Sequence, residues 1–174
     1  MLRRFRRRAA TGRAGDNRKD IQDGINSVGQ TGPMATVHRE MIIEVSPDEV
    51  WDALRDFGAV HQRLVPGFLV DLRLDGPDRI VTFFNGAVAR ERLVTVDDEM
   101  RRLVWSIVES SAGLAHLNAS AQVFAAGGGR TRFVWIEDVL PDEAAGPIAA
   151  LMDRGLATIK RTLEQPSSSS GEAS

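Results

Sequence analysis

One segment near residue 46 indicates a strand that turns directly into a short helix. Ser46 and Glu49 have the spacing of a capping box, in which each side chain accepts a hydrogen bond from a backbone N–H at the helix start. Pro47 suits the first helical position because the N–H that proline lacks would have no partner there. The segment predicts a helix over residues 46–57 whose apolar face consists of Val50, Trp51, Leu54 and Phe57.

Strand-like runs and short turn signals fill most of the chain around this helix. A strand is expected before it, over residues 36–45, and a second short helix after it, over residues 59–64. Asn85-Gly86 is a strong hairpin signal, and Gly127-Gly128-Gly129 closes another hairpin. Consecutive strands joined by such turns form an antiparallel meander. Its predicted strands cover residues 68–74, 79–84, 88–96, 102–109, 114–125 and 131–140.

A long helix is predicted after the last strand, beginning at Pro141 and Asp142 and extending to about residue 163. One face of the meander needs a cover, and the apolar stripe of this helix can supply it. The sequence therefore predicts an α+β fold, in which a curved antiparallel sheet of six or seven strands wraps around the C-terminal helix. The stripe consists of Ile148, Leu151, Met152, Gly155, Ile159 and Leu163.

The two ends of the chain differ from this domain in composition. Residues 1–33 hold eight Lys or Arg and three Asp, a net charge of +5, whereas residues 34–174 carry −7. We expect residues 1–34 to be a disordered basic extension, 35–164 the folded domain and 165–174 a disordered Ser-rich tail. The N-terminal arginines either contact an anionic surface or belong to a solvated extension ahead of a start at Met34.

The composition argues against several classes of function. The chain contains no cysteine, which excludes disulfides, thiolate nucleophiles and Cys-based metal sites. The acidic charge of the domain opposes binding to nucleic acid. No apolar run approaches the about 20 residues that span a bilayer, and no apolar segment typical of a secretory signal follows the arginines. We expect a cytoplasmic monomer or homodimer with no stable membrane insertion and no nucleic-acid partner.

Several short motifs follow one another between residues 37 and 163. They are Val50-Trp51 after Ser46-Pro47, Asn85-Gly86 before residues 90–93 (Arg-Glu-Arg-Leu), Asp97-Asp98, residues 105–107 (Trp-Ser-Ile) and residues 131–135 (Thr-Arg-Phe-Val-Trp). In this order the chain resembles the polyketide cyclase/dehydrase and lipid-transport family of the START-like (SRPBCC) superfamily. The resemblance implies the helix-grip fold of the birch-pollen allergen, which normally encloses a ligand cavity. It is less specific for function, since the superfamily includes hydrophobic-ligand carriers, hormone sensors and aromatic cyclases.

Three glutamates share strand faces with large aromatic residues. Because alternate residues of a strand lie on one face, Glu91, Glu109 and Glu137 would lie among Trp105 and Trp135 if these faces point towards the helix. Carboxylates in an apolar pocket have raised pKa values and can act as acid or base, which suits an aldol-type cyclisation or a dehydration. In the alternative, Glu91 pairs at a strand edge with Arg90, Arg92 or Arg132.

The predicted strand over residues 114–125 is polar on one face and apolar on the other. The polar face, with His116 and Asn118, normally points to solvent, but in a cavity-bearing fold it can line a polar end of the pocket. His116 is therefore a third candidate acid or base, beside Glu91 and Glu137. No histidine or glutamate spacing typical of a metal site is present, so no metal or cofactor is expected.

These residues support three interpretations of function. The first is a protein that holds a small hydrophobic or aromatic ligand, lipid- or polyketide-like, between the sheet and the C-terminal helix. The second is a cofactor-free cyclase or dehydratase that uses the same cavity. The third is a partner-binding protein whose turns at Pro66-Gly67 and Asn85-Gly86 respond to the ligand. The predicted ligand-binding residues are Phe84, Trp105, Ile107, Asn118, Phe133, Trp135, Leu151, Met152 and Ile159.

Overall fold

A computed structural model describes residues 32–165 of the chain. The predicted N-terminal extension (1–34) and C-terminal tail (165–174) lie outside this range, apart from residues 32–34 and 165. No helix within residues 32–165 is long and apolar enough to cross a membrane.

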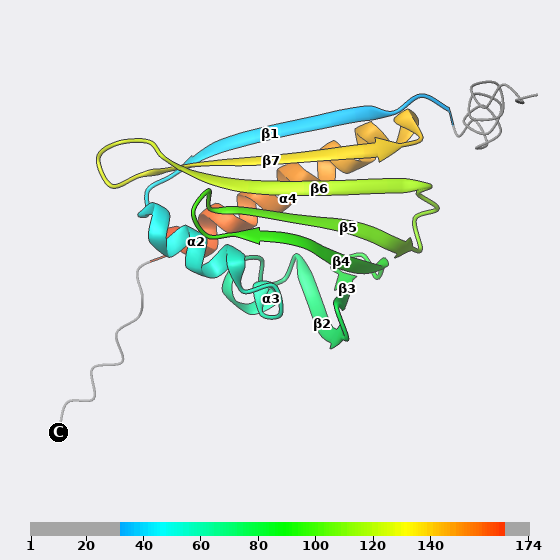
Figure 1. Cartoon of the computed structure of the whole chain (residues 1–174), viewed down its shortest axis with the longest axis horizontal. Coiled ribbons are helices and arrows are strands. Elements are labelled where there is room, and N and C mark those ends of the chain that lie inside the picture. Colours follow the sequence, from blue (N-terminus) through cyan, green and yellow to red (C-terminus); the bar gives the residue numbers. More distant parts are fainter. Residues whose placement is uncertain (1–31, 166–174) are drawn as a thin grey trace, which may run out of the picture. The chain divides into compact units, whose positions relative to one another are not determined.

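The described residues form a curved antiparallel sheet of seven strands with a long helix across one face (Figure 1). The strands run in the order β1-β7-β6-β5-β4-β3-β2, so the first strand pairs with the last and the others form a meander. This arrangement confirms the predicted helix-grip fold. The elements are β1 (Ala35–Ile43), α2 (Pro47–Arg55), α3 (Val60–Arg63), β2 (Leu69–Asp75), β3 (Asp78–Phe83), β4 (Val88–Asp97), β5 (Arg102–Ser110), β6 (His116–Ala125), β7 (Thr131–Leu140), η1 (Asp142–Ala144) and α4 (Ala145–Glu164).

The helix α2 begins with the predicted capping box. The Ser46 hydroxyl accepts a hydrogen bond from the Glu49 backbone N–H at 3.3 Å, and the Glu49 carboxylate accepts one from the Ser46 N–H at 3.4 Å. Trp51 is buried, and its indole N–H donates to Asp98 in the β4–β5 turn at 3.0 Å. These contacts hold α2 in place. Together with α3 it connects β1 and β2, the two edge strands of the sheet.

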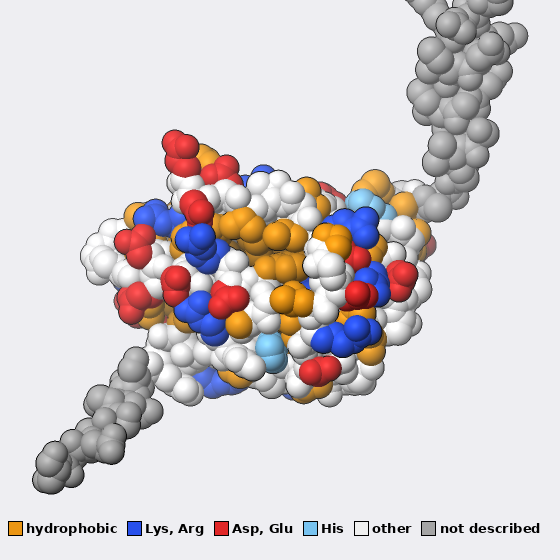
Figure 2. Space-filling view, turned by 60° about the horizontal axis from the view of Figure 1, so that its bottom comes forward, with side chains coloured by type: hydrophobic (Ala, Val, Ile, Leu, Met, Phe, Trp, Pro, Cys, Tyr) orange, Lys and Arg blue, Asp and Glu red, His pale blue; other side chains and the backbone are white. Residues whose placement is uncertain are grey.

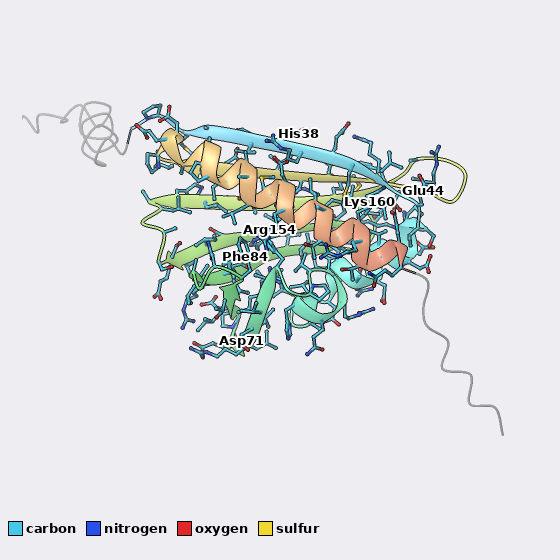
Figure 3. All side chains as sticks on the ribbon, turned by 180° about the vertical axis from the view of Figure 1, so that it is seen from behind. His38, Glu44, Asp71, Phe84, Arg154 and Lys160 are labelled. Carbon is cyan, nitrogen blue, oxygen red and sulfur yellow. The ribbon has the colours of Figure 1, made fainter. Side chains whose placement is uncertain are left out.

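The helix α4 lies across the concave face of the sheet, as Figure 3 shows from behind. Its buried stripe faces the sheet, and Arg39 on β1 is paired with Asp153 on α4 at 2.7 Å. The regular helix begins at Ala145, later than predicted, because residues 142–144 form a 3₁₀ turn first. The buried stripe consists of Ile148, Met152, Gly155, Leu156, Thr158 and Ile159.

The surface carries charges of both signs around exposed hydrophobic side chains. Figure 2 shows hydrophobic side chains gathered in the middle of one face, with Lys, Arg, Asp and Glu side chains around them. Valines on β4 and β5 contribute to the exposed apolar surface, among them Val94, Val96 and Val108. These side chains lie outside the hydrophobic core.

Candidate functional site

A cavity of about 100 Å³ lies between the sheet and α4, and α2 and α3 contribute to its wall. Its side chains are apolar except for Arg79, Glu91 and Glu137. The strands contribute alternate residues to the lining, for example Phe133, Trp135 and Glu137 on β7, because these point to the concave face. A concave, largely apolar space with a few polar groups is the usual form of a small-molecule site.

The size of the cavity limits what it can enclose in this conformation. Drug-sized ligands occupy sites of about 300–1,000 Å³. The cavity is nearer to an engineered apolar cavity of about 150 Å³ that binds benzene. One ring is therefore the upper limit for this conformation, and a larger ligand requires the walls to move.

Most of the residues predicted from the sequence line this cavity. Glu91 and Glu137, two of the three candidate catalytic residues, are among them. The predicted ligand-binding residues in the lining are Trp105, Ile107, Phe133, Trp135, Leu151, Met152 and Ile159.

Three predicted site residues do not line the cavity. His116 and Asn118 lie on the outer face of β6, because the cavity residue Leu117 between them points inward. The polar face of this strand thus takes the ordinary orientation for an antiparallel sheet. Phe84 follows β3 and packs against Phe68, with its ring centroid 5.9 Å from that of Phe68. The Arg154 guanidinium of α4 lies 3.5 Å from the Phe84 ring centroid, and both side chains are labelled in Figure 3.

Glu109 is also outside the cavity, although simple alternation placed it beside Trp105. In the ladder Glu91 pairs with Ile107, but Arg90 pairs with Glu109, so one extra residue of β5 forms a bulge. The bulge reverses the alternation beyond Ile107. The Glu109 carboxylate consequently lies on the side of Arg90, 3.6 Å from the Arg90 guanidinium, and is largely exposed.

Glu91 forms a buried ion pair with Arg79, a cavity residue that the sequence did not single out. The two residues are opposite each other on β3 and β4, and Arg79 Nε lies 2.6 Å from Glu91 Oε2. The side chains are only 6% and 7% exposed. Arg79 Nη1 also donates to the Phe57 carbonyl at 2.9 Å, and the guanidinium stacks 3.8 Å above the Phe57 ring. Arg79 and Glu91 thus form part of the cavity wall, and their opposite charges compensate each other.

Glu91 pairs with an arginine, as the alternative interpretation expected, but its partner is none of the three arginines named there. Arg90 and Arg92 point to the opposite face of β4, where both pair with Asp78 at 3.1 and 2.8 Å. Arg132 pairs with Glu40 on β1 at 3.0 Å. Alternation within the strand separates Glu91 from its two arginine neighbours. The same reasoning points to Arg79, since it shares a face with the cavity residue Phe83.

Glu137 is the second buried carboxyl of the cavity and has no basic partner in the described part of the chain. It is 7% exposed. Loss of hydration raises its pKa to about 8, and the negative charge of Glu91 adds to the shift. The nearby Trp135 indole opposes the shift only weakly. The group is therefore mostly a neutral carboxylic acid at neutral pH, able to donate or accept a hydrogen bond.

Gly155 lets α4 pack directly against the cavity wall. A Cβ atom there would lie 2.8 Å from Cζ3 of Trp135 and 3.5 Å from Cζ of Phe68. Substituting Gly155→Ala should therefore displace the indole ring. Overpacking costs about 1–3 kcal/mol, and alanine stabilises a helix by up to about 1 kcal/mol relative to glycine. We therefore expect the free energy of unfolding to fall by about 1–2 kcal/mol.

Gly146→Ala on the same helix is the matched control for Gly155→Ala. Apart from its chain neighbours and the backbone of its own helix, nothing lies within 4 Å of a Cβ atom at Gly146. Urea denaturation should show Gly146→Ala closer to wild-type stability than Gly155→Ala, because the following Pro147 offsets the gain in helix propensity but no aromatic ring has to move. Equal stability of the two variants would show that the Trp135 contact does not constrain α4.

The family follows from the comparison with known proteins. Residues 34–164 match the family described as "Polyketide cyclase / dehydrase and lipid transport". The chain belongs to this family. No curated protein matches it.

Within residues 32–165, no group of three or more His, Asp or Glu side chains is placed to hold a metal ion.

Solved structures share the fold at low sequence identity. An uncharacterised protein from Bacillus thuringiensis has a TM-score of 0.68 and 20% identity, covering 74% of this chain and 98% of its own. Norcoclaurine synthase from Thalictrum flavum, solved with dopamine and hydroxybenzaldehyde, has a TM-score of 0.59 and 21% identity, covering 94% and 99%. A START superfamily protein from Mycobacterium smegmatis has a TM-score of 0.59 and 12% identity, covering 74% and 94%.

Proposed function

We propose that the chain binds a small hydrophobic or aromatic molecule in the cavity between the sheet and α4. The observation that carries this proposal is the cavity itself, whose lining is apolar except for Arg79, Glu91 and Glu137. Membership of a family described by lipid transport supports a hydrophobic ligand. The norcoclaurine synthase structure, which shares the fold, holds two aromatic molecules and supports an aromatic one.

Native mass spectrometry of protein purified from its own host tests this proposal. The informative variant is Ala121→Leu, because Ala121 is a small, fully buried lining residue at the centre of β6. Three added carbons there should fill part of the cavity at a cost of about 1–3 kcal/mol in stability. Ser120→Leu puts the same side chain on the outer face of the same strand and is the matched control.

We expect wild type and Ser120→Leu to retain the same small molecule and Ala121→Leu to retain much less of it. Thermal unfolding should first show that both variants are folded. Equal retention by all three proteins would place the ligand outside the cavity and contradict the proposal.

A second candidate function is acid–base catalysis on a ligand in the same cavity. The observation that favours it is Glu137, a buried carboxyl whose pKa is raised to about 8 and which can therefore deliver a proton at neutral pH. Glu137 would give its proton to the carbonyl oxygen while water takes the α-proton, so the protein should accelerate exchange of the α-protons of a small ketone such as acetophenone with D₂O. Glu137→Gln should abolish this acceleration and still bind the ketone. No acceleration by wild type would favour binding alone.

A further inference from the structure

The Trp135 indole presents an unused hydrogen-bond donor inside the molecule. Its Nε1 is buried and has no hydrogen-bond partner among the described residues. Trp135 also lines the cavity, packed between Trp105, whose ring centroid is 6.2 Å away, and the Gly155 position of α4. Buried donors are nearly always paired in native proteins. Among the described residues, this N–H has only the nearby Glu137 carboxyl as a candidate acceptor, and the two do not meet in hydrogen-bonding geometry.

The Glu137 carboxyl lies two residues further along the same face of β7 and also lines the cavity. It is more than nine-tenths buried. The Trp135 indole lies near enough to lower its pKa, but the two groups make no hydrogen bond of normal geometry. Each of the other two polar lining residues has a partner, because Arg79 donates to both the Glu91 carboxylate and the Phe57 carbonyl. The unsatisfied hydrogen-bonding capacity of the cavity is thus concentrated at Trp135 and Glu137.

We propose that the ligand carries an uncharged oxygen, as a carbonyl or a hydroxyl group, that accepts hydrogen bonds from the Trp135 indole N–H and the protonated Glu137 carboxyl. This inference rests on the proposed function and narrows it to a class of ligand. A pure hydrocarbon leaves both groups unpaired. From the volume of the cavity, we expect the rest of the ligand to be about the size of one ring.

A carboxylate ligand does not fit this site. Glu91 and Glu137 both face the cavity, and the single cationic lining residue, Arg79, is neutralised by Glu91 at 2.6 Å. A ligand anion would be buried without a free counter-charge, which is strongly unfavourable. The site therefore selects a neutral oxygen over both a hydrocarbon and an acid of the same size.

Three one-ring probes separate these cases by calorimetric titration near pH 6.5, where Glu137 is protonated. Toluene has no polar group, benzaldehyde has a neutral acceptor and benzoate has a charged one. Benzaldehyde should bind most tightly and benzoate most weakly. In Trp135→Phe the benzaldehyde Kd should rise by about two- to tenfold, the usual effect of one buried hydrogen bond, while the toluene Kd stays within about twofold.

NMR of the wild-type protein gives a readout that does not depend on the variant folding. The ¹⁵N–¹H spectrum contains one indole signal for each of the three tryptophans, and Trp135→Phe assigns one of them. If that variant does not fold, selective contacts to Phe133 protons assign the signal in the wild type. Benzaldehyde should move the Trp135 indole proton further downfield than toluene does, because only the aldehyde accepts its hydrogen bond.

The outcomes distinguish this inference from the function on which it rests. If neither toluene nor benzaldehyde binds to the wild type, both the proposed function and the inference fail. If both bind but benzoate is tightest, or Trp135→Phe weakens toluene and benzaldehyde equally, the cavity function stands and the inference is overturned. An indole proton that responds identically to the two neutral probes overturns it as well.

Discussion

Replacing Glu137 with Gln should prevent most of the loss of stability that wild type shows as the pH rises from about 5 to about 8. The Glu137 pKa is raised from 4.5 to about 8 in the folded protein. Between these values the unfolded chain releases the proton and the folded protein keeps it, so rising pH favours the unfolded state. At about 1.4 kcal/mol per pKa unit, the wild-type loss from this group is on the order of 4 kcal/mol.

The measurement is the free energy of unfolding from urea titrations at several pH values. Glu137→Gln should give a much flatter profile and should be more stable than wild type near pH 8, because the amide keeps the size of the side chain without a proton to lose. Glu109→Gln is the control, since that carboxyl is exposed, and it should follow the wild-type profile. Parallel profiles for wild type and Glu137→Gln would show that Glu137 is ionised in the folded protein.

The buried pair of Arg79 and Glu91 should produce the second large effect. Removing one partner of a buried ion pair leaves the other charge uncompensated and typically costs about 3–5 kcal/mol. We expect Arg79→Met and Glu91→Leu each to lose stability in this range. Arg79→Met should lose more, because it leaves Glu91 unpaired near Glu137.

The double variant Arg79→Met/Glu91→Leu should recover much of the stability that each single variant loses, because neither charge remains. Arg39→Met is the control, since Arg39 and Asp153 form an exposed pair at 2.7 Å, and its effect should stay within about 1 kcal/mol. Additive losses in the double variant would mean that the two side chains contribute separately and not as a pair.

The fold was predictable from the sequence because its signals are local. The capping box at Ser46 and Glu49 and the turn at Asn85-Gly86 depend on a few neighbouring residues, and the structure contains both. The apolar stripe of the last helix likewise placed α4 on the sheet. The pairing of β1 with β7 joins residues about 100 positions apart, which no local signal predicts. For this pairing the prediction depended on the resemblance to a known family.

The candidate site was predictable only where strand alternation is regular. Trp135 and Glu137 on β7 follow the period of two without interruption. Glu109 does not, because the bulge in β5 changes the face of every later residue, and the sequence around it has no distinct signal. The Arg79–Glu91 pair depends on the register of β3 against β4. Composition alone does not distinguish Arg79 from the other arginines as the partner of Glu91.

Contacts between bound benzaldehyde and the methyl groups of the cavity wall test most directly whether the space between the sheet and α4 holds the ligand. Filtered NMR experiments on methyl-labelled protein detect such contacts. We expect them to Leu117 on β6 and to Met152 and Ile159 on α4, all of which line the cavity. Contacts confined to exposed side chains such as Val70 and Leu74 would show that the ligand binds the outer surface and would contradict an internal site.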